Sequence, residues 1–318
     1  MVTSRLYPLL LALLLCGPRT WAQNTTPATK KAPIQPVPTI PAREAAPLKV
    51  RFETQDVTNF WRAFDADAAG MPGNLFATLY WQPATPGTRI LLEKNGLANA
   101  DSLRAVVRRR RADYLRIRAS SERMASAVPA CRATYLALKN LYPAATFPPV
   151  IFGIGIFGVG GNAQAVGLLL SAEMNAPADM PALAAHEAVH LQQNIPYKYR
   201  ILLEQCLIEG GADFVAELAS GRIVKTEPYE YAVGREKQLW QEFARDQNLG
   251  ENDSFANWLY GGDRPAGRPS DLGYYIGYQI CKAYYSRATD KRQAVHDILN
   301  IADCRQFLQQ SHYAGQFR

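Results

Sequence analysis

The feature that most constrains this chain is an HExxH segment at residues 186–190. The chain has only four histidines, so the pattern is expected by chance only about 0.002 times. On a helix, residues four positions apart lie on the same face, so His186 and His190 can hold one metal ion through their imidazoles. Glu187 lies one position round the helix and can reach a metal-bound water without being a ligand. The segment therefore predicts a helix that carries a metal site.

The residues around the motif also favour a helix. Asp179 can cap its N-terminus, and Pro181 falls in the first turn, where its missing N–H does no harm. Residues 182–193 are mostly helix formers. We therefore expect a helix from about residue 180 to residue 193.

A second predicted helix, residues 201–220, offers a third ligand. Catalytic zinc sites use three protein ligands and keep the fourth position open. Glu209 lies 19 residues after His190, a separation that allows a turn and a second helix beside the first. Glu204 and Glu217 fit this spacing less well and stay as alternatives. The expected zinc ligands are thus His186, His190 and Glu209.

The residues after Glu209 suggest a crowded neighbourhood. Gly210 and Gly211 each cost a helix about 1 kcal/mol relative to Ala, so they indicate a backbone that approaches closely. Gly273 and Gly277, four residues apart, allow the same in a later helix. Asp213 lies one turn beyond Glu209 and can accept a hydrogen bond from the outer nitrogen of a ligating histidine.

This set of residues resembles the gluzincin pattern of thermolysin-like peptidases, and departs from it at Ile208, where those enzymes carry Asn. A resemblance that covers nearly the whole domain is to the DUF2268-type family of predicted zinc-dependent proteases, which is similar to a gliding-motility lipoprotein family. The segments that carry it are residues 57–66, 186–193, 202–221, 258–260 and 268–285. The resemblance implies a secreted bacterial metallopeptidase.

The function that these residues favour is an exported zinc metallopeptidase that acts on a peptide or protein substrate. Zinc would polarise the scissile carbonyl and activate a water, and Glu187 would accept the proton and return it to the leaving amine. The alternative is a non-catalytic cell-envelope or gliding-motility-associated protein that keeps the zincin scaffold. The sequence does not determine the substrate, the choice between endo- and exopeptidase action, or the oligomeric state.

A late aromatic motif supplies further candidates. A Tyr hydroxyl could donate to the oxyanion of a tetrahedral intermediate, and the sequence does not choose among Tyr274, Tyr275 and Tyr278. Arg268 could bind a substrate carboxylate or Asp271.

Residues 1–22 have the features of a secretory signal peptide. Arg5 precedes an apolar run of eleven residues, 6–16, which is too short to span a bilayer. A lipid anchor at Cys16 is less favoured, because Leu15 precedes it instead of a small residue. We therefore expect a periplasmic or extracellular protein.

Residues 23–47 are rich in Pro and predict an extended tether, so that residues 48–318 form the folded domain. No later apolar run is long enough to span a membrane. The net charge of +7 is modest and partly local, in the run Arg108–Arg111, which argues against nucleic acid as a partner. This run predicts a solvated helix face, with contact to an anionic surface as the alternative.

The remaining pattern predicts an α+β, helix-dominated, zincin-like domain with a small sheet next to the HExxH helix. The expected helices are residues 54–66, 74–81, 101–118 and 124–141, and the expected strands are residues 148–159 and 165–174. The second strand would present an edge to an extended peptide. The four mature cysteines form two disulfides or serve as small buried hydrophobes: Cys131, Cys206, Cys281 and Cys304.

Overall fold

The computed structural model describes residues 43–317, except 159, 165, 251, 262 and 263. These residues belong to one compact unit, Thr39–Arg318. The predicted signal peptide, Cys16 and most of the predicted tether lie outside the described residues. The end of that segment belongs to the compact unit, where Glu44 pairs with Phe147 in an antiparallel bridge and Pro47 is buried.

Helices account for most of the described chain. The α-helices are α1 Gln55–Ala68, α2 Pro86–Lys94, α3 Ala100–Arg109, α4 Arg111–Ser121, α5 Val128–Leu141, α6 Met180–His190, α7 Leu202–Ser220, α8 Glu227–Ala232, α9 Glu236–Asp246, α10 Leu272–Arg287, α11 Lys291–Leu299 and α12 Cys304–Ser311. The other helical segments are η1 Pro47–Lys49, the π-helix η2 Ala77–Trp81, η3 Met124–Ala127 and η4 Tyr313–Phe317. The strands are β1 Phe52–Glu53, β2 Val150–Gly153, β3 Gly161–Gln164 and β4 Gly167–Ser171.

The strands form one small mixed sheet in the order β1-β2-β4-β3. The two predicted strands are present as β2 and β4, which are parallel neighbours, with Val150 opposite Leu168. β4 has three successive leucines, 168–170, and is buried along its whole length, as expected for an inner strand. The prediction that residues 165–174 form an edge is therefore wrong. The outer strand on this side of the sheet is β3, which pairs antiparallel with β4.

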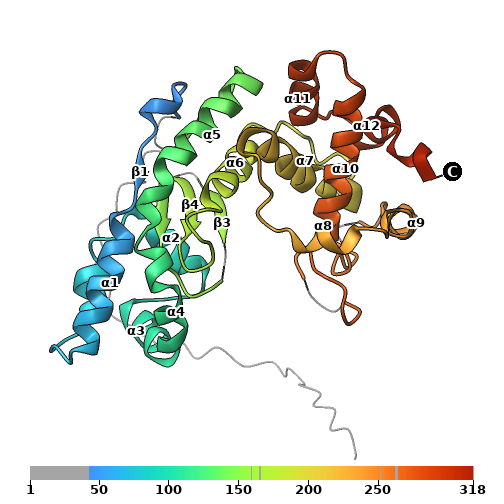
Figure 1. Ribbon diagram of the computed structural model, residues 1–318. Coiled ribbons are helices and arrows are strands. Elements are labelled where there is room, and N and C mark those ends of the chain that lie inside the picture. Colours follow the sequence, from blue (N-terminus) through green and yellow to red (C-terminus); the bar gives the residue numbers. More distant parts are fainter. Residues whose placement is uncertain (1–42, 159, 165, 251, 262–263, 318) are drawn as a thin grey trace, which may run out of the picture. The chain divides into compact units, whose positions relative to one another are not determined.

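The two helices that carry the predicted ligands lie in the middle of the unit (Figure 1). α6 packs against β3, β4 and α5 on one side and against α7 on the other. α7 in turn packs along α10, and α11 and α12 also contact it. The fold class is thus α+β and helix-dominated, with the sheet next to the HExxH helix, as the sequence predicts.

The contact between α7 and α10 depends on glycines, which confirms the predicted close approach. A methyl group at Gly277 would overlap the carbonyl oxygen of Cys206, and one at Gly210 would overlap the backbone nitrogen of Tyr278. A methyl group at Gly273 would lie 2.7 Å from the Cys206 sulfur. The two backbones therefore touch where α7 carries the predicted third ligand.

The predicted helix 101–118 is wrong as a single element, because the chain breaks at Arg110 into α3 and α4. Arg110 has φ −103° and ψ 23°, which is not helical. Its side chain bonds to Asp113 at 2.8 Å and to the Ile156 carbonyl at 3.1 Å. These contacts to the following helix and to the loop after β2 favour the break over a continuous helix.

The arginine run is only partly the solvated face that the sequence predicts. Arg108 forms a two-pronged ion pair with the buried Asp67 of α1. Arg111 lies over the ring of Phe64, with its guanidinium carbon 4.6 Å from the ring centroid. These arginines therefore help to attach α3 and α4 to α1.

Within the described residues the four cysteines are free and buried, so of the two alternatives the small buried hydrophobes are correct: Cys131, Cys206, Cys281 and Cys304. Within the described part of the chain, no helix combines the length and the apolar character that a membrane span requires.

Candidate metal centre

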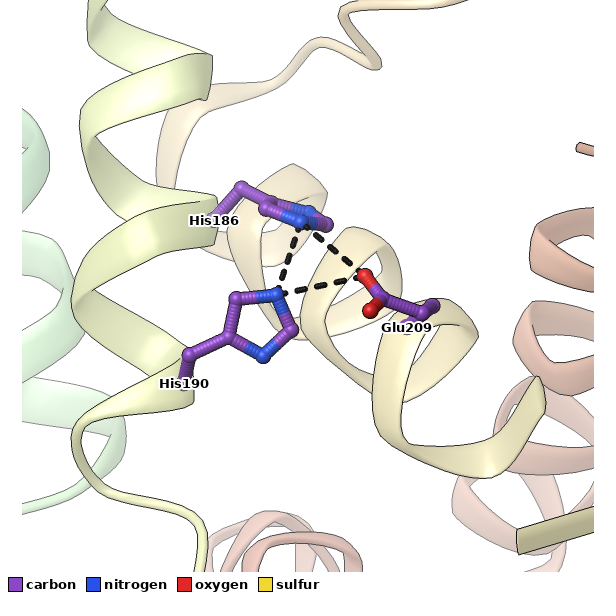
Figure 2. A group of neighbouring side chains, drawn as sticks. All are labelled: His186, His190 and Glu209. Atoms are coloured by element: carbon purple, nitrogen blue, oxygen red, sulfur yellow. Dashed lines mark hydrogen bonds and ion pairs between the residues drawn. The ribbon is translucent and has the colours of Figure 1, made fainter. Parts of the chain in front are cut away.

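Three side chains from α6 and α7 point toward one another (Figure 2). The Nε2 atoms of His186 and His190 are 3.0 Å apart, because the two residues lie one helical turn apart on the same face of α6. The Oε2 atom of Glu209 lies 3.6 Å from the first nitrogen and 3.3 Å from the second. Among the described residues, these three form a group able to hold a metal ion.

The triangle of donor atoms has the size that a zinc ion requires. A tetrahedral zinc at about 2.0–2.1 Å from each ligand keeps the ligand atoms about 3.3–3.4 Å apart. The observed sides of 3.0, 3.3 and 3.6 Å bracket that value. Two imidazole nitrogens and one carboxylate oxygen are also a donor set of catalytic zinc sites. The residues therefore fit zinc in both geometry and chemistry.

The electrostatics of the group favour a cation. Burial by itself would lower the pKa of His186, but the carboxylates of Asp213 and Glu209 raise it well above its ordinary value. Burial would raise the pKa of Glu209, but the two histidines hold it well below its ordinary value. The site thus stabilises an ionised carboxylate and positive charge near it.

Each histidine has a partner on its outer nitrogen. His186 Nδ1 lies 2.8 Å from Asp213 Oδ1, as the sequence predicts, and Tyr229 donates to the other oxygen of Asp213 at 2.8 Å. His190 Nδ1 lies 2.8 Å from Gln193 Oε1, a contact that the sequence analysis did not foresee.

The outer oxygen of Glu209 also has partners that the sequence analysis missed. The amide of Gln205 and the hydroxyl of Tyr260 donate to Oε1 at 3.2 and 3.3 Å. Tyr260 has φ 61°, in the left-handed region, which costs a non-glycine residue about 1–3 kcal/mol. Its N–H donates to the buried carboxylate of Asp271 at 2.9 Å, which holds this strained backbone in place. Oε2 of Glu209 is thereby left to face the histidines.

The site opens into a cavity of about 600 Å³. Its lining comes from β3, α6, α7, α10, the segment between α6 and α7 and the loop before α10. The lining residues are Gly161, Asn162, Ala163, His186, Glu187, His190, Gln193, Ile195, Tyr197, Gln205, Ile208, Glu209, Tyr260 and Tyr274. Glu187 is buried in this lining, and burial raises its pKa. A methyl group at Gly161 would lie 2.8 Å from Glu187 Oε1, so glycine at the start of β3 makes room for this carboxylate.

The alternative ligands lie elsewhere. Glu204 is buried and accepts a hydrogen bond from the backbone N–H of Tyr199 at 2.8 Å. Glu217 accepts from the hydroxyl of Tyr278. Neither belongs to the group of three.

The three candidate tyrosines lie in different surroundings, and only one of them lines the cavity. Tyr274 lines the cavity, and its ring stacks on His186 with centroids 6.1 Å apart and an interplanar angle of 13°. Tyr278 is engaged with Glu217, and Tyr275 packs its ring edge against Tyr229. Tyr274 is thus the candidate with access to the metal centre.

The suggested pairing of Arg268 with Asp271 is not what the structure shows. Arg268 forms an ion pair with Glu242 at 2.8 Å, and its side chain is 11% exposed. Asp271 instead pairs with Lys225 at 2.9 Å. Arg268 therefore stabilises the fold beside α9 and does not line the cavity.

Asp179 is the N-cap residue of α6, as predicted, and its carbonyl accepts from the Leu183 N–H at 3.0 Å, but its side chain does not cap the helix. Its carboxylate pairs with Arg222 at 3.1 Å instead. The helix ends at His190, three residues earlier than expected, so Gln193 lies in the segment that leaves the helix.

A comparison with protein families places these observations in context. The model of the DUF2268 family, described as a predicted Zn-dependent protease, matches residues 124–302, which is more than half of the chain. The matched segment contains β2 to β4, α6, α7 and α10, and hence every residue of the three-ligand group. Neither the search of curated proteins nor the search of solved structures finds a match. The chain belongs to the DUF2268 family of predicted Zn-dependent proteases.

Proposed function

We propose that this protein is a zinc metallopeptidase in which His186, His190 and Glu209 hold the metal and Glu187 is the general base. The observation that supports this most is the triangle of donor atoms, sized for zinc, beside a buried carboxylate that is not one of the three. When bound, a zinc ion supplies Lewis acidity, which polarises a carbonyl and lowers the pKa of water.

Glu187 is suited to move a proton. Burial raises its pKa above the ordinary value, a shift in the direction that helps a carboxylate to accept a proton. It lines the cavity on the same helix as the two histidines, and its carboxylate lies beside Gly161 of β3. In the proposed reaction it takes a proton from the attacking water and delivers it to the leaving amine.

The edge strand β3 is the proposed support for the substrate. Gly161, Asn162 and Ala163 line the cavity, and β3 is one of the two outer strands of the sheet. An extended peptide could add to this edge through main-chain hydrogen bonds, which would bring a peptide bond beside Glu187. Tyr274 is placed to donate its hydroxyl to the carbonyl oxygen of the bond under attack.

We also propose that the chain is exported. This rests on the predicted signal peptide and tether of residues 1–47. N-terminal sequencing of protein from the periplasm or the medium should begin near residue 23. A chain that keeps Met1 in the cytosol would contradict export without affecting the proposed chemistry.

The test of the activity is a peptide-library digest by the wild type and by Glu187→Gln. The wild type should cleave peptides, and Glu187→Gln should keep its zinc but lose cleavage, because the base is removed and the ligands stay. Glu204→Gln is the matched control, since it neutralises a buried Glu outside the site and should cleave normally. A zinc-loaded wild type that cleaves nothing would instead favour the non-catalytic envelope protein.

A further inference from the structure

We propose that Gln193 is a positioning residue that keeps the proton of His190 on Nδ1 and so presents the lone pair of Nε2 to the metal. The inference rests on the proposed zinc site and adds a residue to it. Gln193 Oε1 lies 2.8 Å from His190 Nδ1, and Gln193 Nε2 donates to the carbonyl oxygen of Ile208 at 2.7 Å.

The second of these contacts fixes the direction of the first. The Ile208 carbonyl can only accept a hydrogen bond, so the amide nitrogen of Gln193 must face it. The amide oxygen must then face His190, and this oxygen can also only accept. A neutral His190 must therefore carry its proton on Nδ1, which leaves Nε2 unprotonated.

The same contacts hold the two ligand-bearing segments together. Gln193 lies just beyond the end of α6, and its backbone N–H still bonds to the Val189 carbonyl at 3.1 Å. Ile208 is the residue before Glu209 on α7. One side chain thus connects the end of the His190 helix to the backbone beside the third ligand.

His186 has an equivalent arrangement made with different chemistry. Its Nδ1 faces the carboxylate of Asp213, which is itself held by Tyr229. When both imidazoles are neutral and their outer nitrogens donate, the two Nε2 atoms and Glu209 Oε2 are three acceptors that face one another. Such a cluster repels itself unless a cation lies between its members. Gln193 is therefore part of what makes this a metal site.

The experiment compares Gln193→Met with Gln192→Met. Met keeps the length of the side chain and removes both hydrogen bonds. Gln192 is the matched control because it leaves the same helix end and is equally engaged, accepting from the Thr146 N–H and donating to the Thr146 and Ala188 carbonyls. It contacts none of the three ligands.

Two quantities are measured: zinc affinity by competition with a chelator, and the position of the His190 proton by ¹⁵N NMR of the metal-free protein. Gln193→Met should weaken zinc binding by about 10–100-fold, the usual effect of removing a partner of a ligand. It should also shift His190 away from the Nδ1–H form. Gln192→Met should change neither, even if it lowers stability as much.

If Gln193→Met does not fold, Gln193→Glu is the second variant for the same NMR measurement. It keeps an acceptor for His190, so the Nδ1–H form should persist. The proposal is overturned if wild-type His190 carries its proton on Nε2, if Gln193→Met binds zinc as tightly as the wild type, or if both Met variants weaken zinc equally. None of these readouts requires peptide hydrolysis, so a failure of the proposed peptidase activity would be seen separately.

Discussion

Two adjacent glycines of α7 should respond in opposite ways to the same substitution. A methyl group at Gly210 would overlap the backbone of Gly277 and Tyr278 and lie 2.5 Å from the Tyr274 carbonyl oxygen. All of these atoms belong to the α10 backbone, which cannot rotate away. A methyl group at Gly211 would have no neighbour nearer than 3.4 Å, at a side-chain methyl of Ile298.

The magnitudes follow from these contacts. Inside a helix, Ala is favoured over Gly by about 0.8–1.0 kcal/mol. Gly211→Ala gains this without a clash, so its free energy of unfolding should rise by up to about 1 kcal/mol. Gly210→Ala must push α7 away from α10, and overpacking of this kind costs about 1–3 kcal/mol, occasionally more. Because both positions lie inside α7, the helix gain is common to the two variants, and they should differ by the overpacking cost of about 1–3 kcal/mol.

The assay is urea unfolding of the metal-free protein followed by circular dichroism, with zinc affinity measured on the same samples. Gly210→Ala should also weaken zinc binding, because Glu209 precedes it on the displaced helix, whereas Gly211→Ala should bind zinc normally. Equal stability changes of the same sign in the two variants would refute the argument that the α7–α10 backbone contact sets the position of the third ligand.

Three further predictions concern single carboxylates and one hydroxyl. Glu209→Gln should weaken zinc binding far more than it lowers stability, whereas Glu217→Gln should leave a chelator titration unchanged; the reverse ranking would show that the third ligand is misassigned. Tyr260→Phe should weaken zinc only a few-fold, since it removes one 3.3 Å contact to Glu209 Oε1, and an unchanged affinity would show that this hydroxyl does not orient the ligand. Burial raises the pKa of Glu173 from 4.5 to about 7, so the folded protein holds this proton more tightly than the unfolded chain does. The free energy of unfolding that this proton contributes is therefore lost as the pH rises from 4.5 to about 7. Relative to the wild type, Glu173→Gln should therefore gain up to about 3 kcal/mol between pH 4 and pH 8 in urea unfolding, and parallel pH profiles would contradict this.

The sequence was most informative where function depends on spacing along one helix. The i, i+4 relation placed His186 and His190 together, and the separation of four residues put Asp213 on the same face of α7 as Glu209. The structure brings all four of these side chains together. Such relations are local, so they can be predicted without knowledge of the tertiary fold.

The missed partners depend on tertiary structure instead. Tyr260 reaches Glu209 across 51 residues of chain, through a loop whose path depends on the buried Asp271. Gln193 is only three residues from His190, but its role depends on the Ile208 carbonyl of another helix. No periodicity in the sequence encodes either contact.

The errors in the fold have the same origin. β3 is short and has no apolar run, because an edge strand need not be apolar on both faces, so it was not among the predicted strands. The helix break at Arg110 replaces a continuous amphipathic pattern with contacts to the loop after β2. In both places long-range packing overrides a local preference.

The most direct test of the proposed metal centre is the zinc content of the purified, dialysed protein and of its histidine variants. The wild type should retain about one zinc per chain, and His186→Ala or His190→Ala should lose it while remaining folded. A wild type that binds no zinc, or a His186→Ala/His190→Ala double variant that still holds about one zinc per chain, would contradict the assignment of the site.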